Sequence, residues 1–150
     1  MGEGIITYTP EMKTSFMHRY DADGTVHVEV ITHDDVTPDT VYRVIADPYG
    51  NKLGDLVAGI YYFFVGVACT SCPAGAKGWI QIGGIHRDVN LGSSMSLTKG
   101  HALVLSGGAV VDSGVVYSGA AGQFAIAMED TDSSETADLM LIPERIVTIS

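Results

Sequence analysis

The sequence predicts an all-β fold, a small antiparallel β-sandwich or β-barrel with an irregular N-terminal arm. Short runs of β-branched and aromatic residues alternate with turn residues (Gly, Asn, Asp and Ser) almost to the C-terminus. The 18 glycines among 150 residues favour turns over long helices. With 46% hydrophobic and 17% charged residues, a chain of this length can bury the core of one domain.

The charge balance limits the partners that the chain can bind. Eighteen acidic and eight basic side chains give a net charge of −10, which repels nucleic acid and anionic lipid. The apolar run Leu56–Ala68 is shorter than the roughly 20 residues of a spanning helix, and it contains two glycines. The first residues lack the pattern of a signal peptide. We therefore expect a soluble protein that binds neither nucleic acid nor membrane.

The N-terminal segment, residues 1–36, is predicted to be an arm or extension of a compact β domain formed by residues 37–150. Within it, Ile5–Thr9 is a candidate short strand, and Asp21–Gly24 (DADG) is a turn. Thr25–Thr32 has the clearest strand alternation in the chain. Its valines point to one face, while His27 and Glu29 point to the other face, which we expect to be solvated.

The compact domain is organised around Gly75–Gly84, where a glycine turn precedes an apolar strand that the glycine pair ends. Gly92–Gly100 is expected to be a loop. The strands expected in this domain are Val41–Ala46, Leu56–Ala68 (as one or two strands), Trp79–Ile82, Ile85–Leu91, His101–Leu105, Val110–Asp112, Val115–Tyr117, Phe124–Met128, Ala137–Ile142 and Ile146–Ile149.

The sequence Cys69-Thr70-Ser71-Cys72 is a CxxC motif. A redox CxxC precedes a helix, but the residues that follow here, PAGAKG, are a poor helix start. A zinc site needs two more ligands, and the spacing to the nearest candidates, His86 and His101, matches no familiar zinc motif. We favour two loop thiols without a catalytic role, with metal binding and redox chemistry as the alternatives.

The remaining polar motifs also fall short of a catalytic or binding site. The five histidines form no HxH or HExxH pair. The DADG turn begins like a calcium loop, but Thr32 stands where that loop needs its closing Glu. The acidic loop Glu129–Glu135 is expected to be solvated, with a divalent ion or a basic partner as alternatives. We predict no catalytic residue, no cofactor and no metal, and hence a protein that is not an enzyme.

From Thr37 onward, the chain runs through TPDTVYRVI, a strand that ends in VGVA, the segment GAKGWIQIGGI, and then GHALVL, FAIAMED and a closing hydrophobic strand. In this series of features it resembles the small β-rich decoration, or cement, proteins of tailed-phage heads. It implies a structural protein that binds the major capsid protein at the virion surface and stabilises the shell. It further implies a homo-oligomer, commonly a trimer, that is produced in the host cytoplasm.

The predicted interface residues are Ile5, Tyr8 and Phe16 in the arm, together with Trp79. One alternative is another virion module, from a tail, fibre or baseplate, or one that binds a receptor. A second is a small trimeric all-β nucleotide hydrolase, because Gly92-Ser93-Ser94 matches a fragment of their phosphate-binding sequence. The aspartate and glycine-rich motifs of those enzymes are missing from this chain. A thiol oxidoreductase built on Cys69 and Cys72 is a weaker alternative.

Overall fold

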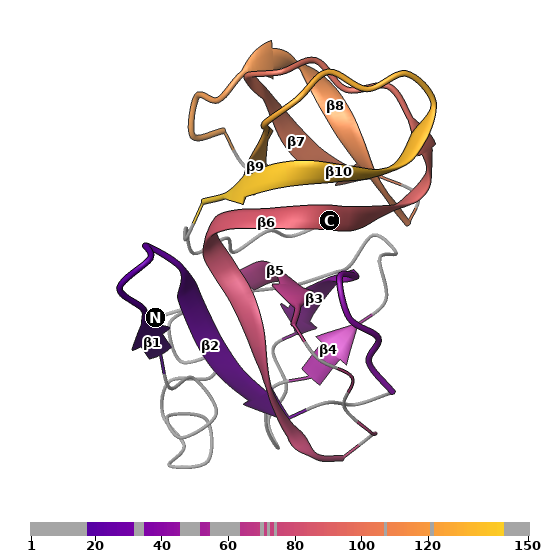
Figure 1. Cartoon of the computed structure of the whole chain (residues 1–150). Coiled ribbons are helices and arrows are strands. Elements are labelled where there is room, and N and C mark those ends of the chain that lie inside the picture. The colour runs from indigo at the N-terminus through magenta and orange to yellow at the C-terminus, as the bar shows by residue number, and fades with distance from the viewer. Residues whose placement is uncertain are drawn as a thin grey trace, which may run out of the picture.

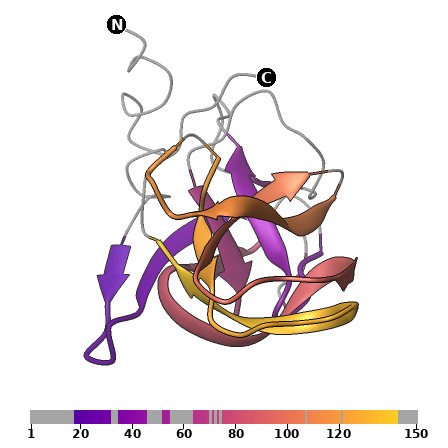
Figure 2. The ribbon, with the colours of Figure 1, turned by 90° about the horizontal axis from the view of Figure 1, so that it is seen from above.

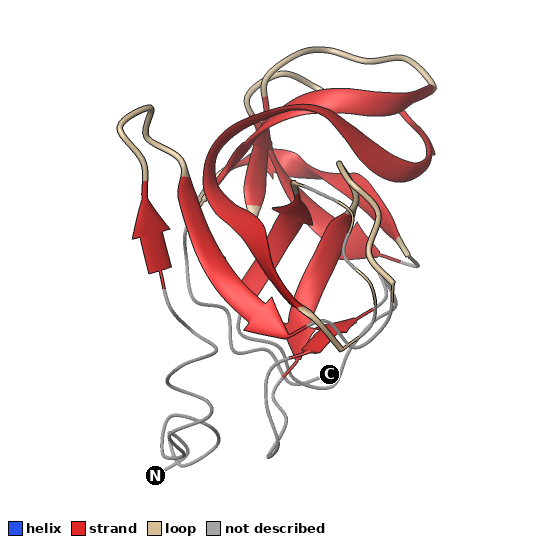
Figure 3. Ribbon diagram, turned by 60° about the horizontal axis from the view of Figure 1, so that its bottom comes forward, coloured by secondary structure: helices blue, strands red, loops and turns tan. Residues whose placement is uncertain are grey.

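The computed structural model of the chain describes residues 18–31, 35–45, 52–54, 64–69, 71, 73, 75–106, 108–120 and 122–142. These residues form ten strands and no helix, so the all-β prediction is confirmed (Figure 3). Nothing in this part of the chain is a helix that could cross a bilayer. The strands are β1 (His18–Tyr20), β2 (Val26–Ile31), β3 (Val41–Ile45), β4 (Lys52–Gly54), β5 (Phe64–Ala68), β6 (Lys77–Met95), β7 (His101–Ser106), β8 (Ala109–Val116), β9 (Ala125–Ala127) and β10 (Ser134–Leu141).

The strands pair antiparallel throughout and form one sheet in the order β4-β3-β5-β6-β10-β9-β7-β8. The β1–β2 hairpin joins this sheet through the pairing of β2 with β6. Since β4 and β8 lie at opposite ends of the order, the sheet is open, and the barrel alternative is not formed. Instead, the sheet curls into two halves that share β6 (Figures 1 and 2).

The long strand β6 corrects the predicted strand ends. We expected the glycine pair to end one strand before Ile85 and a loop to begin at Gly92, but Lys77–Met95 is a single strand. Gly84 and Gly92 have φ values of +86° and +83°, so they bend the strand while the hydrogen-bonded ladder continues. The part of β6 before the bend at Gly84 pairs with β2 and β5. The part from this bend onward pairs with β10 (Figure 1).

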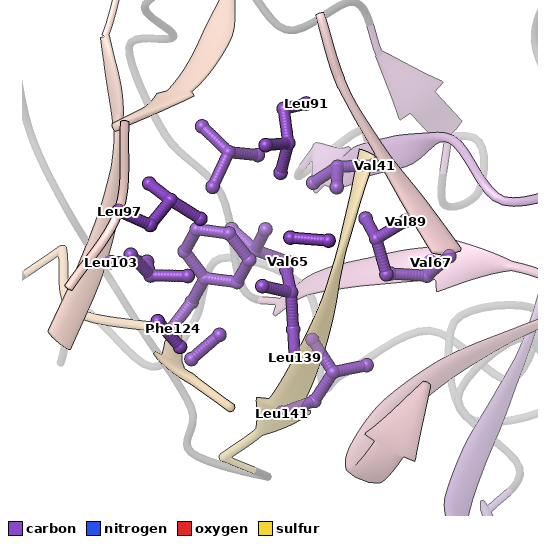
Figure 4. Close-up of a cluster of buried hydrophobic side chains, with 14 residues drawn as sticks. Val41, Val65, Val67, Val89, Leu91, Leu97, Leu103, Phe124, Leu139 and Leu141 are labelled. Carbon is purple, nitrogen blue, oxygen red and sulfur yellow. The ribbon is translucent and has the colours of Figure 1, made fainter. Parts of the chain in front are cut away.

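A hydrophobic core lies between the two halves of the sheet (Figure 4). Val41, Val65 and Val67 enter it from β3 and β5, on one side of the bend. Leu103, Phe124 and Leu139 enter it from the side of β7, β9 and β10, and all three are essentially inaccessible to solvent. Because both halves bury apolar side chains in the same cluster, the architecture corresponds to the sandwich that the sequence predicted.

The second half of the predicted N-terminal arm belongs to the sheet. Val28 of β2 is fully buried, and it has Ile80 of β6 as its cross-strand neighbour, followed by Ala68 of β5. These three side chains form a buried apolar row across the sheet. The alternation of Thr25–Thr32 correctly predicted that Val28 faces the buried side of its strand. The earlier part of the arm, residues 1–17, lies outside the described residues.

Three further differences from the predicted elements concern short strands and a bulge. β1 and β4 are three-residue strands that the sequence did not indicate, since so few residues carry no measurable alternation. The two pieces expected around Gly114 are one strand, β8, in which this glycine has a φ of +83°. The pairing of β8 with β7 shifts register nearby, as expected of a bulge.

Candidate functional site

Of the four predicted interface residues, the structure places only Trp79; Ile5, Tyr8 and Phe16 lie outside the described residues. Trp79 lies in β6 opposite Glu29 of β2 and is half-buried. The Arg19 guanidinium carbon lies 4.8 Å from the centre of the Trp79 ring, which is cation–π distance. One ring face is thus covered by a residue of the same chain, and an interface role for Trp79 stays a prediction.

A polar network fixes the bend of β6. His86 Nδ1 lies 2.8 Å from Gln81 Oε1, and His86 Nε2 lies 2.8 Å from Asp39 Oδ1. The Gln81 amide nitrogen donates to the carbonyls of Gly83 and Ile85, both at 3.0 Å, so its oxygen is left to accept from His86. Both ring nitrogens of His86 are therefore engaged inside the fold, and a metal would have to displace one of these contacts.

His27 corrects the prediction of a solvated face. It is only 7% exposed, because β1 lies beside it through Arg19 and the buried Gln81 is its neighbour in β6. His27 Nδ1 lies 3.2 Å from Asp21 Oδ2 but forms no hydrogen bond there. Burial lowers the pKa of His27, and the charge of Arg19 adds to that effect, while Asp21 and Asp23 partly oppose it. The folded chain therefore favours a neutral imidazole.

Cys69 is a half-buried free thiol, 3.8 Å from the carbonyl oxygen of Val67. Burial raises its pKa above the usual value, although the Arg19 charge acts in the other direction. A higher pKa means less thiolate at neutral pH, so Cys69 is a poor nucleophile. Cys72 lies outside the described residues, which contain no cluster of three or more His, Cys, Asp or Glu able to hold a metal ion.

The predicted DADG turn is confirmed. The Asp23 carboxylate accepts from the Thr25 backbone N–H at 3.0 Å and from the Thr25 hydroxyl at 2.6 Å. Gly24 completes the turn with a φ of +88°. The turn packs against the bend of β6, since a Cβ on Gly84 would lie 2.9 Å from the carbonyl oxygen of Gly24.

The acidic loop is exposed at most of its positions, as predicted, and it also forms hydrogen bonds with neighbouring backbone groups. The Asp130 carboxylate accepts from the Lys99 backbone N–H, and the Glu129 carboxylate accepts from the Asp138 backbone N–H, both at 2.8 Å. The Thr131 hydroxyl accepts from the Leu97 N–H and donates to the Met95 carbonyl, each at 2.9 Å. These contacts fix the loop beside the turn that leads into β7.

Asp112 connects that turn to β8. It accepts from the backbone N–H groups of Thr98 at 2.8 Å and Gly114 at 2.7 Å, and it lies 2.9 Å from His101 Nδ1. Burial acts to raise the pKa of Asp112, but the two backbone donors and His101 outweigh it and lower the pKa below the ordinary value. The pair of Asp112 and His101 thus holds the start of β7 against the bulge of β8.

The end of β8 carries the clearest exposed apolar surface in the described part of the chain. Val115 is 53% exposed and Val116 is 66% exposed, and both follow the bulge at Gly114. No charged residue occurs between Asp112 and Glu129 in the sequence. We call Gly114–Ala120 the β8 surface; most of its residues are exposed. The sequence analysis did not predict this surface. The absence of charged residues from this stretch could have indicated it.

No family model matches the chain, and neither does any curated protein. The chain is similar to the N base of the head fibre of bacteriophage phi29, with 12% sequence identity and a TM-score of 0.49. The similarity covers 81% of this chain and 98% of that one.

Proposed function

We propose that this chain is a non-enzymatic structural protein of a phage virion, which decorates the capsid surface and stabilises the shell as a homo-oligomer. The observation that carries the proposal is the placement of the segments that resemble decoration proteins. VYRVI is β3, VGVA ends β5, and GWIQIGGI lies within β6. HALVL lies in β7, and FAIAMED contains β9. All five strands belong to one sheet with a shared core.

This architecture suits a protein that acts by binding alone. A preformed β core lowers the ordering entropy that association costs, because few backbone groups must be fixed at the interface. A protein that binds only the assembled shell stabilises that shell by mass action. The net charge of −10 also favours a partner surface with basic character, which we propose to be part of the major capsid protein.

The proposed homo-oligomer and its place on the shell can be tested together. The first step is the mass of the purified protein by light scattering. The second is cosedimentation with expanded and with unexpanded empty phage heads. An oligomer that sediments with expanded heads and resists removal by washing is the expected result. A protein that binds neither form of the head would contradict the capsid role.

A matched pair of variants sharpens the capsid test. Trp79→Ala removes the predicted interface residue, whereas Glu135→Gln changes an exposed side chain near the start of β10. Loss of cosedimentation with Trp79→Ala alone would support the predicted interface. Immunogold labelling of intact particles separates the capsid from the alternative virion locations, because label on tails, fibres or baseplates would favour a module of that structure.

A further inference from the structure

We infer that the β8 surface, Gly114–Ala120, is the place where a second copy of this chain binds. The inference rests on the homo-oligomer of the proposed function and names its contact surface. It does not depend on the capsid, so the two can fail separately.

The exposed valines are the first support. β8 is the last strand of the sheet and pairs with β7 on one side. Gly92 of β6 approaches the residue before β8, where a Cβ on that glycine would lie 2.6 Å from the carbonyl oxygen of Gly108. At the other end of β8, Val115 and Val116 are more than half exposed. Burial of the exposed part of each valine against a partner would remove apolar area from water, which favours association.

The distribution of charge is the second support, and it favours another copy as the partner. Two molecules that each carry a net charge of −10 repel each other wherever their acidic groups face one another. The stretch from Ser113 to Met128 carries no charged side chain, so it contributes no like charge to a contact between two copies. The nearest carboxylate in the sequence, Asp112, is turned inward to His101 and two backbone N–H groups. A basic partner would gain no electrostatic attraction from this surface.

The contact is made by side chains rather than by strand addition. The Ser113 hydroxyl donates to the Val115 carbonyl at 3.2 Å, and the Val115 N–H points to the same hydroxyl at 3.4 Å. The backbone N–H and carbonyl of Val115 thus both have hydrogen-bond partners in their own chain. This makes pairing of a further strand with β8 at this position less favourable. Because Asp112 and β7 hold the bulge in place, the valines are presented in a fixed arrangement and little ordering entropy is lost on binding.

The test compares variants of the full chain by analytical ultracentrifugation. Val116→Asp and Val115→Asp place a carboxylate in the proposed contact, and Val115→Ser with Val116→Ser removes apolar area without adding charge. Thr136→Asp, at an exposed position of β10, is the matched control. We expect the wild type and the control to associate, and each β8 variant to associate at least about tenfold more weakly. Thermal unfolding measured in parallel shows whether each variant is folded.

A mixing experiment adds a readout that loss of folding cannot mimic. Equal amounts of Val116→Asp and Val116→Lys should associate more tightly together than either variant alone, because opposite charges then face each other. A wild-type monomer, or an oligomer that the β8 variants leave intact, would overturn the inference. An oligomer that the β8 variants weaken but that does not bind phage heads would instead support the inference and contradict the capsid function.

Discussion

His86 Nε2 and Asp39 Oδ1 lie 2.8 Å apart although 47 positions separate them in the sequence. Asp39 has a φ of +59°, and its backbone also donates to the Ala68 carbonyl and accepts from the Asn90 N–H. The segment before β3 is thus attached to β5 and to the part of β6 that pairs with β10. The pair therefore anchors the connection between the two halves of the sheet.

We predict that His86→Ala destabilises the fold more than Asp39→Ala. The loss of His86 leaves the buried oxygen of Gln81 without its donor, which costs about 1–3 kcal/mol. The Asp39 side chain is 52% exposed, so water replaces much of its interaction. Urea unfolding of the two variants and of the double variant measures both costs and their coupling. Equal costs for the two single variants would contradict this account.

We predict that Gly84→Ala destabilises the fold more than Gly75→Ala. Both glycines have a positive φ, of +86° and +83°, which costs another residue roughly 1–2 kcal/mol. Only at Gly84 would the new Cβ also meet backbone, at 2.9 Å from the carbonyl oxygen of Gly24. Around Gly75 nothing lies within 4 Å of the added atom, which makes this variant the control. Chemical denaturation curves give the difference.

Asp112 should account for part of the loss of stability in acid. Its pKa is lowered in the folded chain, so the unfolded chain binds its proton more readily. Its contribution is present above the unfolded value of about 3.8 and is lost as the pH falls through the lower folded value. Asp112→Asn should reduce the fall in the free energy of unfolding that acid causes, as measured by denaturant unfolding at several pH values. Asp132→Asn, at an exposed position, is the control.

His27 should make the fold sensitive to pH in a higher range. Burial lowers the pKa of His27 below the ordinary 6.5, so in this window the unfolded chain binds more protons than the folded chain. The contribution of neutral His27 to the unfolding free energy is then fully present above pH 6.5. It decreases as the pH falls toward the lower pKa that His27 has in the folded chain. Melting temperatures between pH 8 and pH 5, measured for the wild type and for His27→Gln, should diverge toward the acidic end. Parallel curves would show that His27 plays no part.

The existence of most strands could be predicted from the sequence because alternation and turn residues are local signals. The continuity of β6 could not, since Gly83 and Gly84 look like a strand end locally, and only pairing with β2 and β10 carries the strand through. The burial of His27 depends on β1, a strand too short to detect. The β8 surface depends on which strand lies at the end of the sheet, and this order is a property of the whole fold.

The sharing of β6 also has a consequence for cooperativity. One continuous strand supplies backbone partners to β2 and β5 at one end and to β10 at the other. Neither half can be released as an independent folding unit without breaking this strand or exposing the common core. The slowest-exchanging amide hydrogens in β2 and in β10 should therefore report the same opening free energy, that of global unfolding.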